Sequence, residues 1–374
     1  VGYLAIRLLE RDGIATGDIM TTPSPSGWRG WFTAGKFLFM DMNSALARSM
    51  SETASHAEIE AFEARLHEGL DQGGLGIGLA LDYISDAVDS RELEMIFRVS
   101  AQRQAPLFVH IRRGIDGDPS GLREVLALAE KHGNPVHICH ISHNAMSNLE
   151  LFLAEIRAAR DRGVDVTTEV LPYNAGSTAI GAAVFGRDWR TIFNIDYADV
   201  EWAATGERLS KETFEQYRRE QPTEPVIHHY LYEAWTRRAI EEPGVIVVSD
   251  LITMKSRDAF VPPHNGAFTR VLGRYVREKN ALDLVTAIEK MTLLPARRLQ
   301  AYAPAFAQKG RLQPGMDADL TIFDAATVLD RASYRDPYQE AQGIEYVVVG
   351  GTLVVSGGEL VEGRFPGRRI LAPQ

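Results

Sequence analysis

The amino-acid sequence predicts an α/β protein of the TIM (β/α)8 barrel type, and two observations lead to this prediction. First, short apolar runs alternate with stretches whose apolar residues recur at helical spacing, which is typical of parallel strands joined by helices. Second, three of the apolar runs end in a side chain that can bind a metal ion, namely His110, His140 and Asp250. The carboxyl ends of the strands of such a barrel converge on one mouth, where active sites lie.

The order of the elements follows from the periodicity of the apolar residues. Helices are expected at 3–10, 51–72, 90–104, 122–132, 149–162 and 232–242. Strands are expected at 13–21, 74–80, 106–110, 135–140, 164–170, 225–228 and 245–250. These segments make about seven strand–helix units, so the first strand of an eight-stranded barrel is expected to precede residue 1.

Two segments break this alternation. Residues 181–224 are rich in aromatic and charged side chains and follow a strand, which predicts a lid over the site. Beyond residue 307 the pattern changes to short β runs separated by glycine turns. We therefore predict a barrel domain over 1–307 and the carboxyl-terminal part of a β-sandwich module over 308–374.

Composition excludes several classes of partner. The chain has 374 residues, 45% of them hydrophobic, and a formal net charge of −10, whereas nucleic acids and anionic membranes favour basic surfaces. No apolar run approaches the roughly 18 residues expected of a membrane span. Cys139 is the only cysteine, so no intrachain disulfide is expected and a reducing, cytoplasmic location is the natural one. Assembly into a homo-oligomer is compatible with this composition.

Three segments resemble a known family. They read LPYNAGST at 171–178, FTRVLGRYVRE at 268–278 and KGRLQPGMDADLTIFD at 309–324. Together they resemble the amidohydrolase superfamily, and within it the N-acyl-D-amino-acid deacylase (D-aminoacylase) branch. The resemblance implies a TIM barrel with a β-sandwich module, and a metal-dependent hydrolase that cleaves the N-acyl bond of a small-molecule amide. It also implies that His110 and His140 are metal ligands, that Asp250 is the aspartate of the last strand, and that Tyr173 helps to hold substrate.

The residues support the same site independently of the family. Alternation along a strand turns His110 to the side of Phe108, and His140 to the side of Ile138. His137 should then point the other way, toward the helices, as a core or surface residue. A lone buried histidine is most often a hydrogen-bonded core residue, but two histidines and an aspartate at strand ends favour a functional site.

Three further residues are candidates for contact with substrate. Tyr173 follows a proline turn and is either a substrate ligand or a packing residue. Arg112 lies two residues beyond His110, where it either binds a substrate carboxylate through two hydrogen bonds or is a solvated loop arginine. His264 lies just beyond the position where the family carries a carboxylate-binding arginine in an H-P-R turn.

The chain departs from the family pattern at its other ligand positions. The family's H-x-H pair is expected before residue 1. Ile19 and Thr21 stand where the family has a glutamate or cysteine ligand, and alternation turns the neighbouring Asp18 to the opposite face. Ser142 stands where some members carry a lysine. Two histidines and one carboxylate still suffice for a single ion with an open position, so one zinc ion is expected rather than two.

The expected mechanism is hydrolysis by a metal-activated water. The metal would lower the pKa of bound water toward about 7, and Asp250 would act as general base and then protonate the leaving amine. Tyr173 would donate to the developing oxyanion. Two alternatives stay open: a degenerate, non-catalytic protein of this fold that binds a partner, and a cyclic-amide hydrolase related to dihydroorotase or hydantoinase.

Overall fold

The computed structural model describes residues 1–12, 47–222, 224–251 and 263–373. Within this part the chain forms two compact units. The first comprises Val1–Thr167 and Asn174–Tyr232, and the second comprises Thr168–Tyr173 and Glu233–Pro373. The predicted division between residues 307 and 308 stays a prediction, since residues on both sides of it belong to the second unit.

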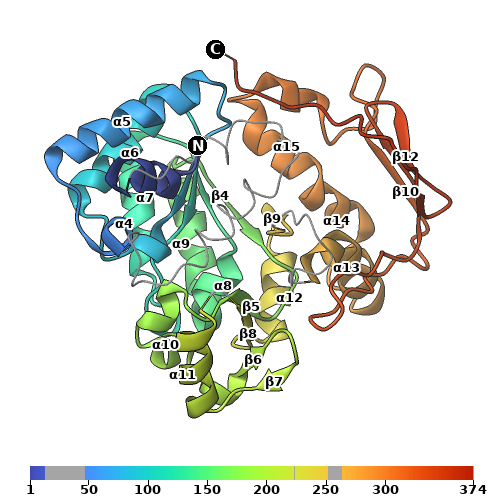
Figure 1. Ribbon diagram of the computed structural model, residues 1–374. Helices are drawn as coiled ribbons and strands as arrows, with labels where there is room; N and C mark the ends of the chain where they lie inside the picture. Colours follow the sequence, from blue (N-terminus) through green and yellow to red (C-terminus); the bar gives the residue numbers. More distant parts are fainter. Residues whose placement is uncertain (13–46, 223, 252–262, 374) are drawn as a thin grey trace. The chain divides into compact units, whose positions relative to one another are not determined.

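The first unit is built on parallel strands that alternate with helices, as the sequence predicts (Figure 1). Its parallel strands are β1 (Ile77–Ala80), β2 (Leu107–His110), β3 (Val136–Ile138) and the beginning of β4 (Val166–Val170). The helices between and after them are α6 (Ser90–Arg103), α7 (Ser120–His132), α8 (Ile141–Ala145) and α9 (Leu149–Asp161). Residues paired across β1 and β2, such as Ala80 and His110, bring the carboxyl ends of these strands to one level.

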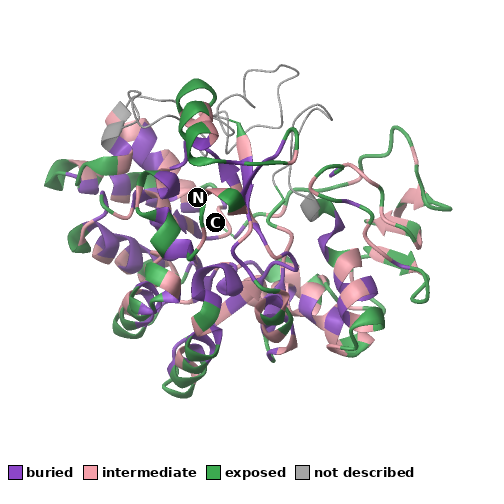
Figure 2. Ribbon diagram, turned by 90° about the horizontal axis from the view of Figure 1, so that it is seen from below, coloured by how far each residue is buried: buried purple, intermediate pink, exposed green. Residues whose placement is uncertain are grey.

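Local sequence signals explain where these helices begin and end. Asp89 caps the first turn of α6 by accepting hydrogen bonds from the backbone N–H groups of Arg91 and Glu92. Helix α7 ends at Gly133, whose φ of 69° lies in the left-handed region that glycine adopts readily. Helices α6, α7 and α9 each contain buried apolar residues at helical spacing. Figure 2 shows that many helices of the protein have both buried and exposed residues.

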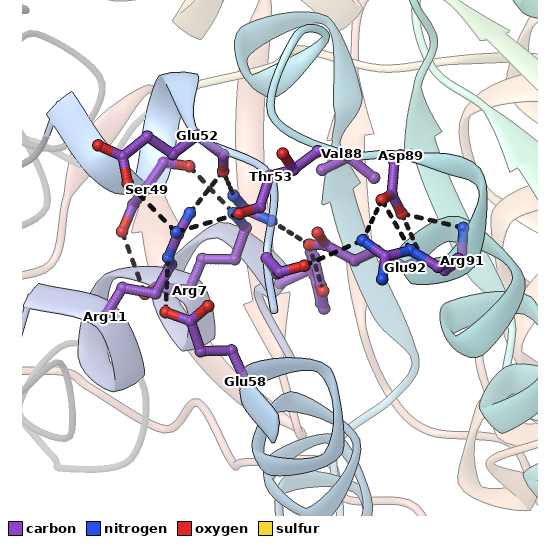
Figure 3. A network of polar contacts seen from close by, with 12 residues as sticks. Arg7, Arg11, Ser49, Glu52, Thr53, Glu58, Val88, Asp89, Arg91 and Glu92 are labelled. Atoms are coloured by element: carbon purple, nitrogen blue, oxygen red, sulfur yellow. Dashed lines mark hydrogen bonds and ion pairs between the residues drawn. The ribbon is translucent and has the colours of Figure 1, made fainter. Parts of the chain in front are cut away.

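The first unit also contains helices α1 (Tyr3–Asp12), α4 (Ala47–Ser51) and α5 (His56–Asp71). Fully buried polar contacts join α1 to α6. The guanidinium of Arg7 donates to Oε1 of Glu92 (Figure 3). The hydroxyl of Tyr3 donates to the same oxygen at 2.6 Å. Arg7 also donates to the backbone carbonyl of Ser49 at 3.0 Å. Residues that are far apart in sequence are thus fixed to one another by charge.

Residues 174–232 form an antiparallel sheet with its own helices. The strands are β5 (Gly176–Ala179), β6 (Val200–Trp202), β7 (Glu207–Arg208) and β8 (Pro225–His228), in the order β5-β8-β6-β7, and the helices are α10 (Trp189–Phe193) and α11 (Lys211–Glu220). The rings of Phe185, Trp189 and Phe214 pack together in its core. The strand expected at 225–228 therefore forms, but it pairs in this antiparallel sheet and not with the parallel strands.

The second unit contains the end of β4, which pairs in parallel with β9 (Val245–Val247). Its helices are α12 (Glu233–Glu241), α13 (Ala267–Arg270), α14 (Leu284–Met291) and α15 (Leu293–Gln300), with a π-helical segment at Val271–Glu278. An antiparallel sheet follows, made of β10 (Leu320–Phe323), β11 (Ile344–Val349), β12 (Thr352–Ser356) and β13 (Glu359–Leu360). The predicted change to short β runs after residue 307 is thus confirmed.

A search of the described residues for helices that are long and apolar enough to cross a membrane finds none.

Candidate metal-binding site

The structure brings His110 and His140 together. His110 is the last residue of β2, and His140 follows β3 after the last ladder hydrogen bond, from Cys139 N–H to Val109 O at 3.0 Å. Nδ1 of His110 and Nε2 of His140 lie 3.2 Å apart, and the two rings are nearly perpendicular at 79°. Both strand ends thus present one imidazole nitrogen each to the same point.

This pair of nitrogens fits a divalent metal ion. A tetrahedral ion with Zn–N bonds of about 2.0–2.1 Å holds two nitrogen ligands about 3.3 Å apart. Burial lowers the pKa of His110 and lowers that of His140 well below its usual value, so both rings are neutral and have a lone pair to offer. Within residues 1–12, 47–222, 224–251 and 263–373, no three His, Cys, Asp or Glu side chains gather closely enough to hold an ion.

The prediction that His137 points away from the site toward the helices is wrong. The parallel register pairs His137 with Phe108, and paired residues of adjacent strands share a face of the sheet. The two rings lie 5.4 Å apart, and Nδ1 of His137 is 2.7 Å from Oγ1 of Thr167 on β4. The alternation argument fails because His140 adopts a left-handed backbone, with φ of 31°, and so leaves the strand geometry on which that argument depends.

The guanidinium of Arg112 forms hydrogen bonds within the protein. Its Nε donates to Oε2 of Glu124 at 2.9 Å, and its two terminal nitrogens donate to the backbone carbonyls of Ser85 and Val88. These contacts fix the turn after β1. A role for Arg112 in binding substrate stays a prediction.

Beside His110 lies a cluster of charges that the sequence analysis missed. Asp82, only 5% exposed, accepts hydrogen bonds at Oδ1 from the backbone N–H of Arg113 at 3.0 Å and from Nη2 of Arg187 at 2.9 Å. Its Oδ2 lies 3.6 Å from Nε2 of His110. Burial alone would raise the pKa of Asp82, but the contact with His110 and the charges of Arg113 and Arg187 outweigh burial and hold it well below its usual range.

A weak signal for Asp82 exists in the sequence. It lies two residues after β1, at the same strand-end level as His110, which is where functional side chains gather in this kind of sheet. Its partner Arg187 is 105 residues away and comes from the 181–224 segment, so the pattern of the chain gives no indication of their contact.

The 181–224 segment also contacts the neighbourhood of the histidines in a second way. The guanidinium of Arg113 lies over the ring of Phe193 at 5.0 Å and near that of Tyr230 at 5.9 Å. The hydroxyl of Tyr230 donates to the backbone carbonyl of His143 at 3.5 Å. Residues from the inserted sheet and from the strand ends therefore share one packed cluster within the first unit.

The second unit contains Asp250, which lies three residues beyond β9 and has a left-handed backbone with φ of 49°. Asp250 is exposed at the protein surface. The pKa of Asp250 is nevertheless raised to about 6. Loss of solvation is the larger cause, and repulsion by Glu169 on β4 is the smaller one. The sequence analysis did not identify Glu169, because it is one of five residues of an otherwise ordinary strand.

Tyr173 is buried in the second unit, with 2% of its surface exposed. The guanidinium of Arg270 covers its ring at 5.0 Å, donates to the carbonyl of Pro172 at 2.8 Å, and pairs with Asp330 at 3.0 Å. Burial, and after it the charge of Asp330, raises the pKa of Tyr173, so its hydroxyl keeps its proton. Whether Tyr173 contacts substrate stays a prediction.

The remaining candidates lie outside what the structure describes. Ile19, Thr21 and Asp18 fall among the undescribed residues. His264 is described only in its backbone, which forms part of the short helical turn at Pro263–Gly266.

A model of the amidohydrolase family matches residues 29–355, and the chain belongs to this family. Among similar proteins, an N-acyl-D-glutamate deacylase of Alcaligenes xylosoxydans xylosoxydans is 33% identical over 322 residues, covering 83% of this chain and 64% of the deacylase. The chain thus spans just under two thirds of that relative's length. The resemblance found in the sequence is confirmed.

Solved structures agree with this assignment. An N-acyl-D-glutamate deacylase from Bordetella bronchiseptica, in complex with zinc and a phosphonate mimic of the tetrahedral intermediate, is 30% identical with a TM-score of 0.70, covering 84% of this chain and 68% of that one. A D-aminoacylase structure is 23% identical with a TM-score of 0.74 and covers 100% of this chain and 87% of its own, which shows the shared fold. The predicted fold class, a TIM-like barrel with a β module, is confirmed.

Proposed function

We propose that this chain carries the core of a metal-dependent hydrolase that cleaves the N-acyl C–N bond of an N-acyl-D-amino acid. The observation that carries the proposal is the pair of imidazole nitrogens of His110 and His140, 3.2 Å apart at two strand ends. The relative from Bordetella bronchiseptica, described with zinc and a tetrahedral mimic, supports zinc as the ion and amide hydrolysis as the reaction. We propose one ion, in line with the two histidine nitrogens that converge.

When bound, a zinc ion supplies a polarised carbonyl and a water of lowered pKa. In this chain Nδ1 of His110 and Nε2 of His140 would hold it. Asp250 is proposed as the group that accepts the proton of the attacking water and passes it to the leaving amine. Its pKa of about 6 suits a group that takes up and releases a proton near neutral pH.

Other residues would orient the substrate. The hydroxyl of Tyr173, whose raised pKa keeps it protonated, would donate a hydrogen bond to the developing oxyanion. Arg112 and His264 are proposed to bind a carboxylate of the substrate. The 181–224 segment is proposed as the lid, and the contact of Arg187 with Asp82 supports this role. The single cysteine favours a cytoplasmic location.

The test is hydrolysis by the zinc-loaded protein and by Asp250→Asn. The wild type should release free amine from N-acetyl-D-glutamate or another N-acyl-D-amino acid of a panel, and Asp250→Asn should lose about 10²–10⁴-fold in kcat. Asp161→Asn, the same change at an exposed position at the end of α9, should be unaffected. Zinc content, measured by mass spectrometry, should be the same in all three proteins.

Full activity of Asp250→Asn would overturn its role as base. A wild type that binds zinc but opens hydantoins or dihydroorotate, and no N-acyl-D-amino acid, would overturn the substrate class.

A further inference from the structure

A buried nitrogen next to the proposed metal site has no hydrogen-bond partner of its own. Among the described residues, Nε2 of His110 is buried and has no acceptor within 3.5 Å. It faces away from the metal side of the ring, because Nδ1 of the same ring faces His140. Oδ2 of Asp82 lies 3.6 Å from it. Since an unpaired buried polar group is costly, this juxtaposition needs an explanation.

Asp82 is fixed in place by three features. It lies in a short helical turn, Leu81–Ile84, that follows directly on β1. Its Oδ1 is held by Arg113 N–H and by Nη2 of Arg187, and only 5% of the residue is exposed. These contacts use one carboxylate oxygen and leave Oδ2 on the side of His110. The carboxylate is therefore an immobile acceptor aimed at the imidazole.

The His110 ring is positioned from a second side as well. The ring of Tyr83 meets it edge to face, with centroids 5.2 Å apart. An imidazole held between an aromatic ring and a carboxylate has few orientations open to it. Its two nitrogens are then distinguished by their neighbours, since only Nε2 has an anionic acceptor beside it.

We propose that Asp82 is a positioning residue for the metal ligand His110, an inference that rests on the proposed metal site. As the anion beside Nε2, at 3.6 Å, it favours the ring form that carries its proton on Nε2 and leaves the lone pair of Nδ1 free for the ion. Arg113 and Arg187 hold Asp82 in this orientation. Asp82 is not itself a metal ligand in this arrangement, because it lies beside the nitrogen opposite to the one that meets His140.

The first test measures zinc affinity. Competition with a chromophoric chelator should show that Asp82→Asn binds Zn²⁺ about 10–100-fold more weakly than the wild type, the effect typical of losing such a partner. Asp86→Asn is the matched control, because it makes the same change at an exposed residue of the same loop. Thermal unfolding of both variants should confirm that they are folded.

The second test reads the protonation of His110 directly and is independent of activity. In zinc-free wild-type protein labelled with ¹⁵N-histidine, the signals that disappear in His110→Gln belong to His110. They should report an Nε2-protonated ring, and in Asp82→Asn a mixture of the two tautomers. If Asp82 had only a structural role, Asp82→Asn would leave the tautomer of His110 unchanged.

An Nδ1-protonated His110 in the wild type would overturn the inference. So would Asp82→Asn with wild-type zinc affinity. A wild type that binds zinc normally but cleaves no N-acyl amide would refute the proposed function and leave the role of Asp82 standing, whereas a wild type that binds no zinc would refute both.

Discussion

Two aspartates, one in each unit, follow strands of the protein, and their pKa values are shifted in opposite directions. Asp82 follows β1 in the first unit, and its pKa is held well below its usual range. Asp250 follows β9 in the second unit, and its pKa is raised to about 6. For both carboxyls, loss of solvation is the largest contribution and acts upward.

The difference lies in the neighbours. Asp82 contacts His110 and lies near the positive charges of Arg113 and Arg187. These neighbours outweigh the effect of burial on its pKa. Asp250 lies near the like charge of Glu169, which raises its pKa further. The two carboxyls thus suit different tasks: Asp82 stays ionised as a fixed acceptor, and Asp250 can exchange a proton near neutral pH.

The largest expected effect comes from breaking a fully buried ion pair. Arg7 and Glu92 are both fully buried, so Arg7→Met would leave the Glu92 carboxylate without its cation. We expect the free energy of unfolding, measured by urea denaturation, to fall by about 3–5 kcal/mol. Arg65→Met, the same change in exposed pairs with Glu10 and Glu68, should cost less than about 1 kcal/mol. Equal losses in the two variants would contradict the importance of burial.

The next effect concerns a buried cation that donates to two backbone carbonyls. Lys290 donates to the carbonyls of Glu242 and Val245, and burial lowers its pKa from 10.5 to about 8. Between these pH values the unfolded chain binds more protons than the folded one, so stability should rise with pH. Relative to Lys290→Met, the wild type should gain up to about 3 kcal/mol in unfolding free energy between pH 7 and pH 10.5.

The control for Lys290 is Lys309, which is paired with Asp317 and Asp319 and has a raised pKa. In the folded protein Lys309 binds its proton more tightly than in the unfolded chain. Relative to Lys309→Met, the wild type should therefore show no gain in unfolding free energy between about pH 7 and pH 10.5. A stability difference between the wild type and Lys290→Met that is flat over this pH range would show that burial does not control Lys290.

The smallest expected effect tests the repulsion at Asp250. Glu169→Gln should lower the pKa of Asp250, but by less than about one unit, because crowding is the larger cause of its shift. A ¹³C-carboxyl NMR titration of zinc-free protein would measure this, with the signal assigned by its absence in Asp250→Asn. Glu340→Gln, at an exposed position, should leave it unchanged. An upward shift in Glu169→Gln would rule out repulsion.

Much of the fold could be predicted because its helices and strands depend on the local spacing of apolar residues. The helices of the first unit have apolar residues at regular spacing, as in α5, where Ile59, Phe62, Leu66 and Leu70 are all buried. The strand ends at His110 and His140 could be predicted for the same reason, and the structure brings these two side chains together.

What could not be predicted depends on backbone turns and distant contacts. The left-handed conformation of His140 is rare for a residue with a side chain, and it reverses the inference about His137. The cluster around Asp82 is closed by Arg187 from another sheet, which no periodicity reveals. The pairing of β8 also depends on a partner, β6, that is too short to give a clear pattern.

The contact of α1 with Glu92 has a consequence for local opening of the chain. Tyr3 and Arg7 end on the same buried carboxylate, 89 and 85 residues away in sequence. Helix α1 cannot detach without leaving that charge unpaired in the interior, so fraying of this helix costs as much as opening the core around α6. We therefore expect its amide protons to exchange with solvent together with those of α6, as one cooperative unit.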